Sequence, residues 1–129
     1  MNTELYTTLR ELLICAEIIL EFEVLDTQQS AHAQQIHHWA SFLANLSEKI
    51  RQLGENSPNL SAYYRTMDAP LRRIMSATDT LLEGENEALT LNQEYSFQRI
   101  KRLANRAAVL AQQIVAELTQ PSNGVPTQK

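Results

Sequence analysis

Apolar residues recur every three or four positions along four long stretches of the chain, which is the spacing of one helical face. The first stretch is the most apolar and predicts a helix from Thr3 to Val24. Asp26 or Thr27 then caps a second helix, which Gly54 ends because glycine tolerates the backbone conformation that follows helix C-termini. Large apolar residues in the second helix follow a heptad and predict its buried seam: Ile36, Trp39, Leu43, Leu46, Ile50 and Leu53.

The third stretch is marked out by proline and glycine. Ser57 followed by Pro58 predicts the start of a helix, and Gly84 closes it. Pro70 lies inside this helix and lacks the N–H of a regular turn, so the helix either kinks there or breaks, with Asp68 capping a new helix. The seam keeps its spacing across Pro70, which favours the kink, and consists of Leu60, Tyr64, Met67, Leu71, Ile74, Thr78 and Leu81.

The last helix is predicted from its capping signals and from an alanine-rich seam. Thr90, with Gln93 three positions later, has the pattern of a capping box, and Pro121 ends the helix. Small side chains in the middle of a seam let neighbouring helices approach closely or leave room for bulky side chains opposite. The predicted seam consists of Phe97, Ile100, Ala104, Ala107, Ala111, Ile114 and Leu118.

Short connections between these helices favour antiparallel neighbours. The sequence therefore predicts an all-α, antiparallel up-down-up-down four-helix bundle whose third helix is kinked or broken near Pro70. The chain has 129 residues, the size of one domain, and residues 1–119 are expected to form it. Residues 120–129 contain few apolar side chains and are expected to be a disordered C-terminal tail.

The net charge and the cysteine content argue against some classes of protein. A net charge of -4 argues against a dedicated nucleic-acid-binding protein, because phosphate contacts need clustered lysine and arginine. The single cysteine, Cys15, has no internal disulfide partner and lies in an apolar stretch, which favours a buried thiol in a reducing compartment. Charged residues interrupt the first helix and no cleavage site frames it, so we expect no membrane span and no signal peptide, and a cytoplasmic protein.

Motifs of catalytic and metal sites are missing from the sequence. It contains no Glu-x-x-His, His-x-x-x-His or Cys-x-x-Cys spacing and no glycine-rich phosphate loop, so we expect no metal and no cofactor. The protein is therefore expected not to be an enzyme. The less favoured alternative is a metal-dependent helical-bundle hydrolase that uses two carboxylate pairs, Glu17 with Glu21 and Asp79 with Glu83.

The first helix carries more apolar residues than one bundle seam needs, and these are the strongest candidate site. Large apolar side chains outside a core usually mark an interface, and a two-fold dimer is the commonest assembly. We expect a homo-oligomer, with a dimer favoured, or a complex with a protein partner; the alternative is that these side chains fill the core. The predicted interface residues are Ile14, Ile18, Phe22 and Leu25, with Phe42 of the second helix.

Arginines form one basic face on the third and fourth helices and give a second candidate site. The predicted anion-binding or nucleic-acid-binding residues are Arg72, Arg73, Arg99, Arg102 and Arg106. An accessory nucleic-acid-binding subunit is the alternative function, which the negative net charge does not favour. The first helix presents glutamates at matching levels, so pairing of the arginines within the bundle is the simpler expectation.

Overall fold

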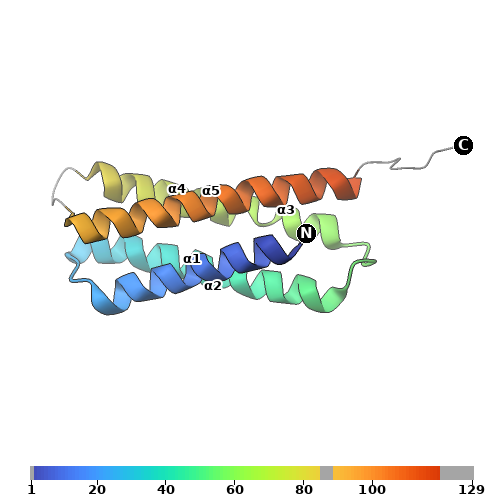
Figure 1. The fold of residues 1–129 in the computed structure, drawn as a ribbon, viewed down its shortest axis with the longest axis horizontal. Helices are drawn as coiled ribbons and strands as arrows, with labels where there is room; N and C mark the ends of the chain where they lie inside the picture. Colours follow the sequence, from blue (N-terminus) through green and yellow to red (C-terminus); the bar gives the residue numbers. More distant parts are fainter. Residues whose placement is uncertain (1, 85–88, 120–129) are drawn as a thin grey trace, which may run out of the picture.

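The computed structural model of the protein describes residues 2–84 and 89–119, so the predicted tail at 120–129 lies outside the described residues. The described residues form five α-helices and no β-strand, which confirms the predicted all-α class (Figure 1). The helices are α1 (Asn2–Phe22), α2 (Thr27–Leu53), α3 (Leu60–Arg65), α4 (Asp68–Glu83) and α5 (Leu91–Thr119).

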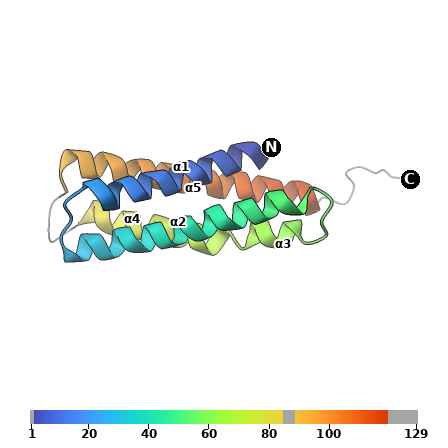
Figure 2. The same cartoon turned by 90° about the horizontal axis from the view of Figure 1, so that it is seen from below.

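The five helices form a bundle of four around one core, because α3 and α4 follow one another along the same side of the bundle. The helix α1 packs against α2 and α5, α4 packs against the same two helices, and α3 packs mainly against α5. Figures 1 and 2 show the long axes nearly parallel, with the start of α1 at the same end of the bundle as the end of α5. Consecutive long helices therefore run in opposite directions, and the predicted four-helix bundle is confirmed.

Capping boxes fix the starts of α2 and α5, where the sequence predicts a cap at Asp26 or Thr27 and a capping box at Thr90. The Asp26 carboxylate accepts a hydrogen bond from the Gln29 backbone N–H at 2.7 Å, and the Gln29 side chain accepts one from the Asp26 N–H at 3.0 Å. Thr90 and Gln93 make the same two bonds at the start of α5, at 3.1 and 3.0 Å. The Gln93 amide also donates to the Val24 carbonyl at 2.9 Å, which ties the start of α5 to the end of α1.

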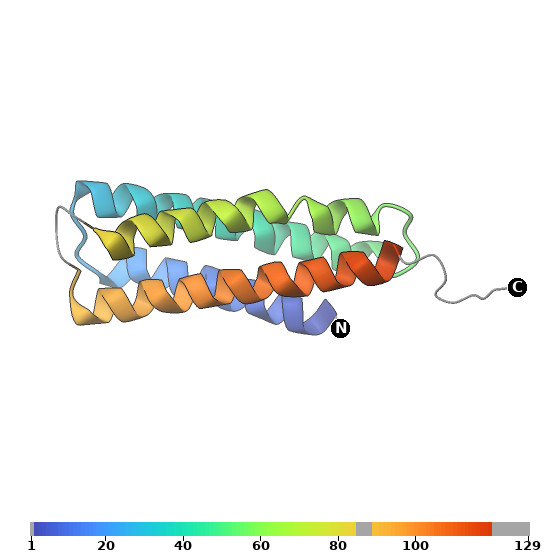
Figure 3. The ribbon, with the colours of Figure 1, turned by 90° about the horizontal axis from the view of Figure 1, so that it is seen from above.

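The third predicted helix is broken into α3 and α4 rather than kinked, and Pro70 explains the place of the break. In a continuous helix the Pro70 ring would clash with the Thr66 carbonyl four residues earlier, and the helix separates between α3 and α4 at this point (Figure 3). Pro70 itself lies in the first turn of α4, where no intrahelical N–H is needed. The predicted start at Ser57 is wrong: α3 begins at Leu60, and the Ser57 hydroxyl instead accepts a bond from the Asn59 N–H at 3.3 Å.

On α2 the buried face is centred on small residues. Its buried residues include Ala33, Ile36, Ala40, Leu43, Ser47 and Ile50. Trp39 and Leu46 are half-buried and pack against the core at the margin of this face, whereas Leu53 is exposed, so the predicted seam is wrong at Leu53. A helix in a four-helix bundle touches two neighbours, so its buried arc is wider than a heptad seam, and here its centre falls on side chains that permit close approach.

The seams predicted for the third helix, now α3 and α4, and for the last helix, α5, are confirmed with one exception. Every predicted seam residue of α3 and α4 is buried, and so are those of α5 from Phe97 to Ile114. Leu118, in the last turn of α5, is exposed. Ala104 and Ala107 in the middle of α5 are fully buried, so atoms of the neighbouring helices enclose these small side chains.

Candidate functional site

Three large apolar side chains of α1 point away from the bundle core. Ile14, Ile18 and Phe22 are 46%, 48% and 71% exposed and follow one another at intervals of one turn. The core-facing side of the same helix is a different set of residues: Leu5, Leu9, Leu12, Ala16 and Ile19. The alternative that the surplus apolar residues of α1 fill the core is therefore wrong for these three.

A shallow groove between α1 and α5 runs beside these side chains. It has a volume of about 340 Å³ and is lined by Glu11, Ile14, Cys15, Ile18, Tyr95, Ser96 and Arg99. Tyr95 is 59% exposed, and Leu91, one turn earlier on α5, is 84% exposed. We call Ile14, Ile18, Phe22, Leu91 and Tyr95 together the α1–α5 surface. The sequence prediction did not include the two α5 residues, although both lie off the α5 seam.

The other two predicted interface residues lie elsewhere. Leu25 is half-buried between α1 and α2 and packs against the core. Phe42 is exposed, and its ring lies 6.0 Å from that of Trp39, which in turn lies 5.3 Å from the Arg73 guanidinium of α4. Phe42 is therefore on the side of α2 that faces α4, and the structure does not bring it together with Ile14 and Ile18.

Ion pairs join α1 and α5 along the edge of the groove. Arg99 donates to the Glu11 carboxylate at 3.3 Å, and Arg106 pairs with Glu4 nearer the start of α1. Cys15 lies beneath this edge, where burial raises the pKa of its thiol and the neighbouring Arg99 charge opposes part of that rise. Because the net direction is upward, the thiol stays protonated at neutral pH and is a poor nucleophile.

The predicted basic face is divided among three edges of the bundle. Arg99 turns toward α1, Arg72 pairs with Asp68 within α4 at 2.7 Å, and Arg73 covers the Trp39 ring toward α2. Among the described residues, Arg102 is the one predicted anion-binding arginine without a salt bridge or an aromatic contact. The guanidinium groups therefore do not form a continuous patch along a nucleic-acid backbone.

The carboxylate pairs of the hydrolase alternative face different neighbours. Glu17 lies 3.6 Å from the His37 imidazole of α2, and Asp79 pairs with Lys101 of α5. Within residues 2–84 and 89–119, no three histidine, cysteine or carboxylate side chains lie close enough together to hold a metal ion. The pairs Glu17 with Glu21 and Asp79 with Glu83 are therefore not brought together into one site.

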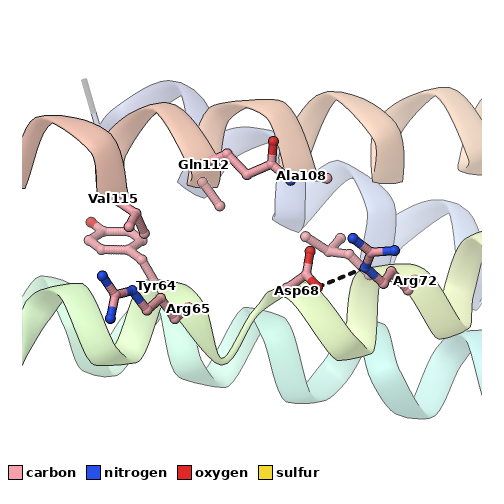
Figure 4. A pocket seen from close by; sticks show the side chains of 9 residues that line it. Tyr64, Arg65, Asp68, Arg72, Ala108, Gln112 and Val115 are labelled. Atoms are coloured by element: carbon pink, nitrogen blue, oxygen red, sulfur yellow. Dashed lines mark hydrogen bonds and ion pairs between the residues drawn. The ribbon is translucent and has the colours of Figure 1, made fainter.

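A second pocket lies at the break between α3 and α4 (Figure 4). It has a volume of about 340 Å³, and the small side chains of Ala108 and Ala111 on α5 form one wall. The Asp68–Arg72 ion pair lies on one side of it, while the Tyr64 side chain extends from α3 toward Val115 on the other. The pocket exists because a broken helix faces alanines, which leave the space between the two elements unfilled.

Tyr64 combines deep burial with an unmet hydrogen bond. The residue is only 3% exposed, and its hydroxyl has no hydrogen-bond partner among the described residues. A buried hydroxyl without a partner costs about 1–3 kcal/mol. Burial, together with the Glu55 charge, also raises the pKa of this phenol above its ordinary value.

Tyr64→Phe is therefore expected to raise the free energy of unfolding by about 1 kcal/mol at neutral pH. Since the folded-state pKa of Tyr64 is raised, the wild type loses stability as the pH rises above the unfolded pKa of about 10, and the variant lacks this loss. Urea titrations at pH 7 and above pH 10 measure both effects, with Tyr63→Phe, at a half-buried neighbouring tyrosine, as the control. A loss of stability in Tyr64→Phe at pH 7 would show that the hydroxyl is satisfied.

Comparisons with known proteins do not assign this chain to a family. No protein-family model matches it, and no curated protein or solved structure is significantly similar to it. Over residues 2–84 and 89–119, none of the helices combines the length and the apolar character needed to cross a membrane. The candidate site is therefore identified from the chemistry and geometry of the chain's own residues.

Proposed function

We propose that the protein is a non-enzymatic interaction protein that docks against another protein molecule through the α1–α5 surface. The observation that carries the proposal is the exposure of Ile14, Ile18 and Phe22 on successive turns of one helix. An interface that buries a large apolar side chain completely gains about 1.5–3 kcal/mol for that side chain, before the costs of association. A protein surface is the occupant that can cover several such side chains at once.

The surroundings of the α1–α5 surface support the same proposal. Charged residues border it, with Arg10 and Glu21 on the outer side of α1 and the Glu11–Arg99 pair on the side of α5. An apolar centre with a polar rim is the usual anatomy of a protein interface. Nucleic-acid binding receives less support, since most of the predicted arginines are engaged within the bundle.

The proposal is tested by placing a photoactivated crosslinking residue, benzoylphenylalanine, at position 18 in the cells that make the protein. Position 53 is the matched control, because Leu53 is exposed to a similar extent, 40% against 48%, at the far end of α2. We expect one discrete protein adduct from position 18 and none from position 53, with the position 18 adduct lost when Phe22→Asp is added. Equal labelling at the two positions, or none, would contradict an interaction surface on α1.

A further inference from the structure

The outer face of α1 is self-complementary in charge. Arg10 and Glu21 are eleven residues apart, which is about three helical turns, so both side chains lie on the same edge of the helix within about 20°. Ile14 and Ile18 lie between them on the adjoining face. The helix therefore presents a positive group, an apolar centre and a negative group in that order along its exposed side.

Neither charged group of this edge has a strong partner inside the bundle. Arg10 makes only a 3.4 Å contact from Nη1 to the Tyr6 hydroxyl and lies 5.7 Å from the Tyr6 ring centre, on an exposed surface. Glu21 makes no ion pair with any described residue. The other glutamates of α1 differ, since Glu4, Glu11 and Glu17 each pair with a neighbouring helix.

We propose that the occupant of the α1–α5 surface is a second copy of this chain, whose α1 lies antiparallel to the first across a two-fold axis. The axis passes midway between Ile14 and Ile18, so that each of these residues packs against the other one in the second copy. This proposal rests on the proposed function and adds the identity and orientation of the occupant. It is an isologous contact, in which every pairing occurs twice.

The register follows from the residue numbers. Arg10 lies six positions before the midpoint of Ile14 and Ile18, and Glu21 lies five positions after it. An antiparallel pair therefore places Arg10 of one copy within one residue, about 1.5 Å along the axis, of Glu21 of the other. Since both side chains lie on the same edge of α1, a two-fold axis perpendicular to the helix brings them to the same side of the interface. The dimer thus gains two Arg10–Glu21 pairs.

The other simple two-fold arrangement brings like charges together. A two-fold axis parallel to the helices would place α1 against α5 of the second copy. Each residue would then keep its height along the bundle axis. The pairs Glu11–Arg99 and Glu4–Arg106 show that Arg10 is level with the arginine-bearing part of α5, close to Arg102. Arg10 would then face Arg102 of the second copy, which is unfavourable. Charge therefore selects the antiparallel pairing of α1 with α1.

Tyr95 completes the centre of this contact. It lines the same groove as Ile14 and Ile18, so it lies at the level of the proposed axis. In the antiparallel arrangement α5 also lies beside α5 of the second copy, and each Tyr95 comes close to its own counterpart. Tyrosine is enriched in such positions because its ring is apolar while its hydroxyl remains hydrated at the rim.

Charge reversal tests the arrangement by light scattering of the purified chain over a range of concentrations. The wild type is expected to be a dimer. Arg10→Glu alone and Glu21→Arg alone each turn two attractive pairs into two repulsive ones and are expected to weaken the dimer by about tenfold or more. A mixture of these two single variants restores every pair and is expected to form a heterodimer at the wild-type affinity. The double variant is expected to regain the homodimer for the same reason.

The controls separate this proposal from the proposed function. Arg65→Glu makes the same charge change at an exposed position on α3, outside the α1–α5 surface, and is expected to leave the dimer unchanged. Ile18→Asp with Phe22→Asp removes the apolar centre and is expected to give a folded monomer, because both side chains are exposed. If this variant is monomeric but Arg10→Glu and Glu21→Arg dimerise normally, the α1–α5 surface is an interface and the antiparallel register is wrong. A tighter dimer in Arg102→Glu would instead favour the arrangement in which α1 of one copy packs against α5 of the second copy.

A wild type that stays monomeric throughout overturns the second copy as the occupant. The proposed function is then decided by the crosslink at position 18, which reports a different protein as well as a second copy. If that crosslink is also absent, both proposals fall.

Discussion

Phe97→Ala is expected to lower the free energy of unfolding by about 3–5 kcal/mol, the largest loss of any substitution considered for this bundle. Phe97 is fully buried in α5, one turn after the capping box that starts the helix. Truncation removes its burial free energy and leaves a cavity, because the helices α1 and α4 that pack on either side of α5 relax only partly into the space. Urea denaturation followed by circular dichroism measures the loss.

Phe42→Ala is the matched control, because it is the same chemical change at a side chain that is 43% exposed. The expected loss is about 1 kcal/mol, since much of the Phe42 ring already faces water. Equal losses in the two variants would mean that Phe97 is not packed in the centre of the bundle.

Ala107→Leu is expected to lower the free energy of unfolding by about 1–3 kcal/mol, although it adds apolar surface to the protein. Ala107 is fully buried in the alanine-rich middle of α5. Neighbouring atoms already enclose this methyl group completely, so a larger side chain forces the helices apart or adopts a strained rotamer. Thermal unfolding and urea titration both report this loss.

Ala116→Leu makes the same change at an exposed position nine residues later on the same helix. Both residues favour helices, so the expected change there is within about 0.5 kcal/mol. If Ala107→Leu were equally neutral, the close approach of helices around the α5 alanines would be wrong.

Sequence periodicity was sufficient to predict the fold, because amphipathic spacing and capping chemistry are local properties. The cap at Asp26 and the capping box at Thr90 depend on side chains three residues apart, and both form as predicted, with Gln29 completing a second box at Asp26. The break at Pro70 has a local steric cause, but the unbroken spacing of the seam favoured a kink, and that preference was wrong. Trp39 lies at the margin of the buried face of α2 rather than at its centre, because only the positions of the neighbouring helices decide where that centre falls.

The candidate site was partly predictable for the same reason. Ile14, Ile18 and Phe22 stand out as a second apolar line beside the α1 seam, and their exposure is visible once that seam is buried. Leu91 and Tyr95 join them only through the packing of α1 against α5, a tertiary relationship that the spacing of residues within one helix does not contain. Whether another protein covers this surface stays a prediction.

The helix α3 has a property that follows from its separation from α4. It spans only Leu60–Arg65, and its backbone hydrogen bonds do not continue into the next helix as those of an intact helix would. A segment of this length has almost no helical stability of its own, so its order depends on the contacts it makes with α5. We therefore expect the end of the bundle that holds α3 to open in local unfolding more readily than the remaining helices, with faster amide hydrogen exchange in α3 than in α4.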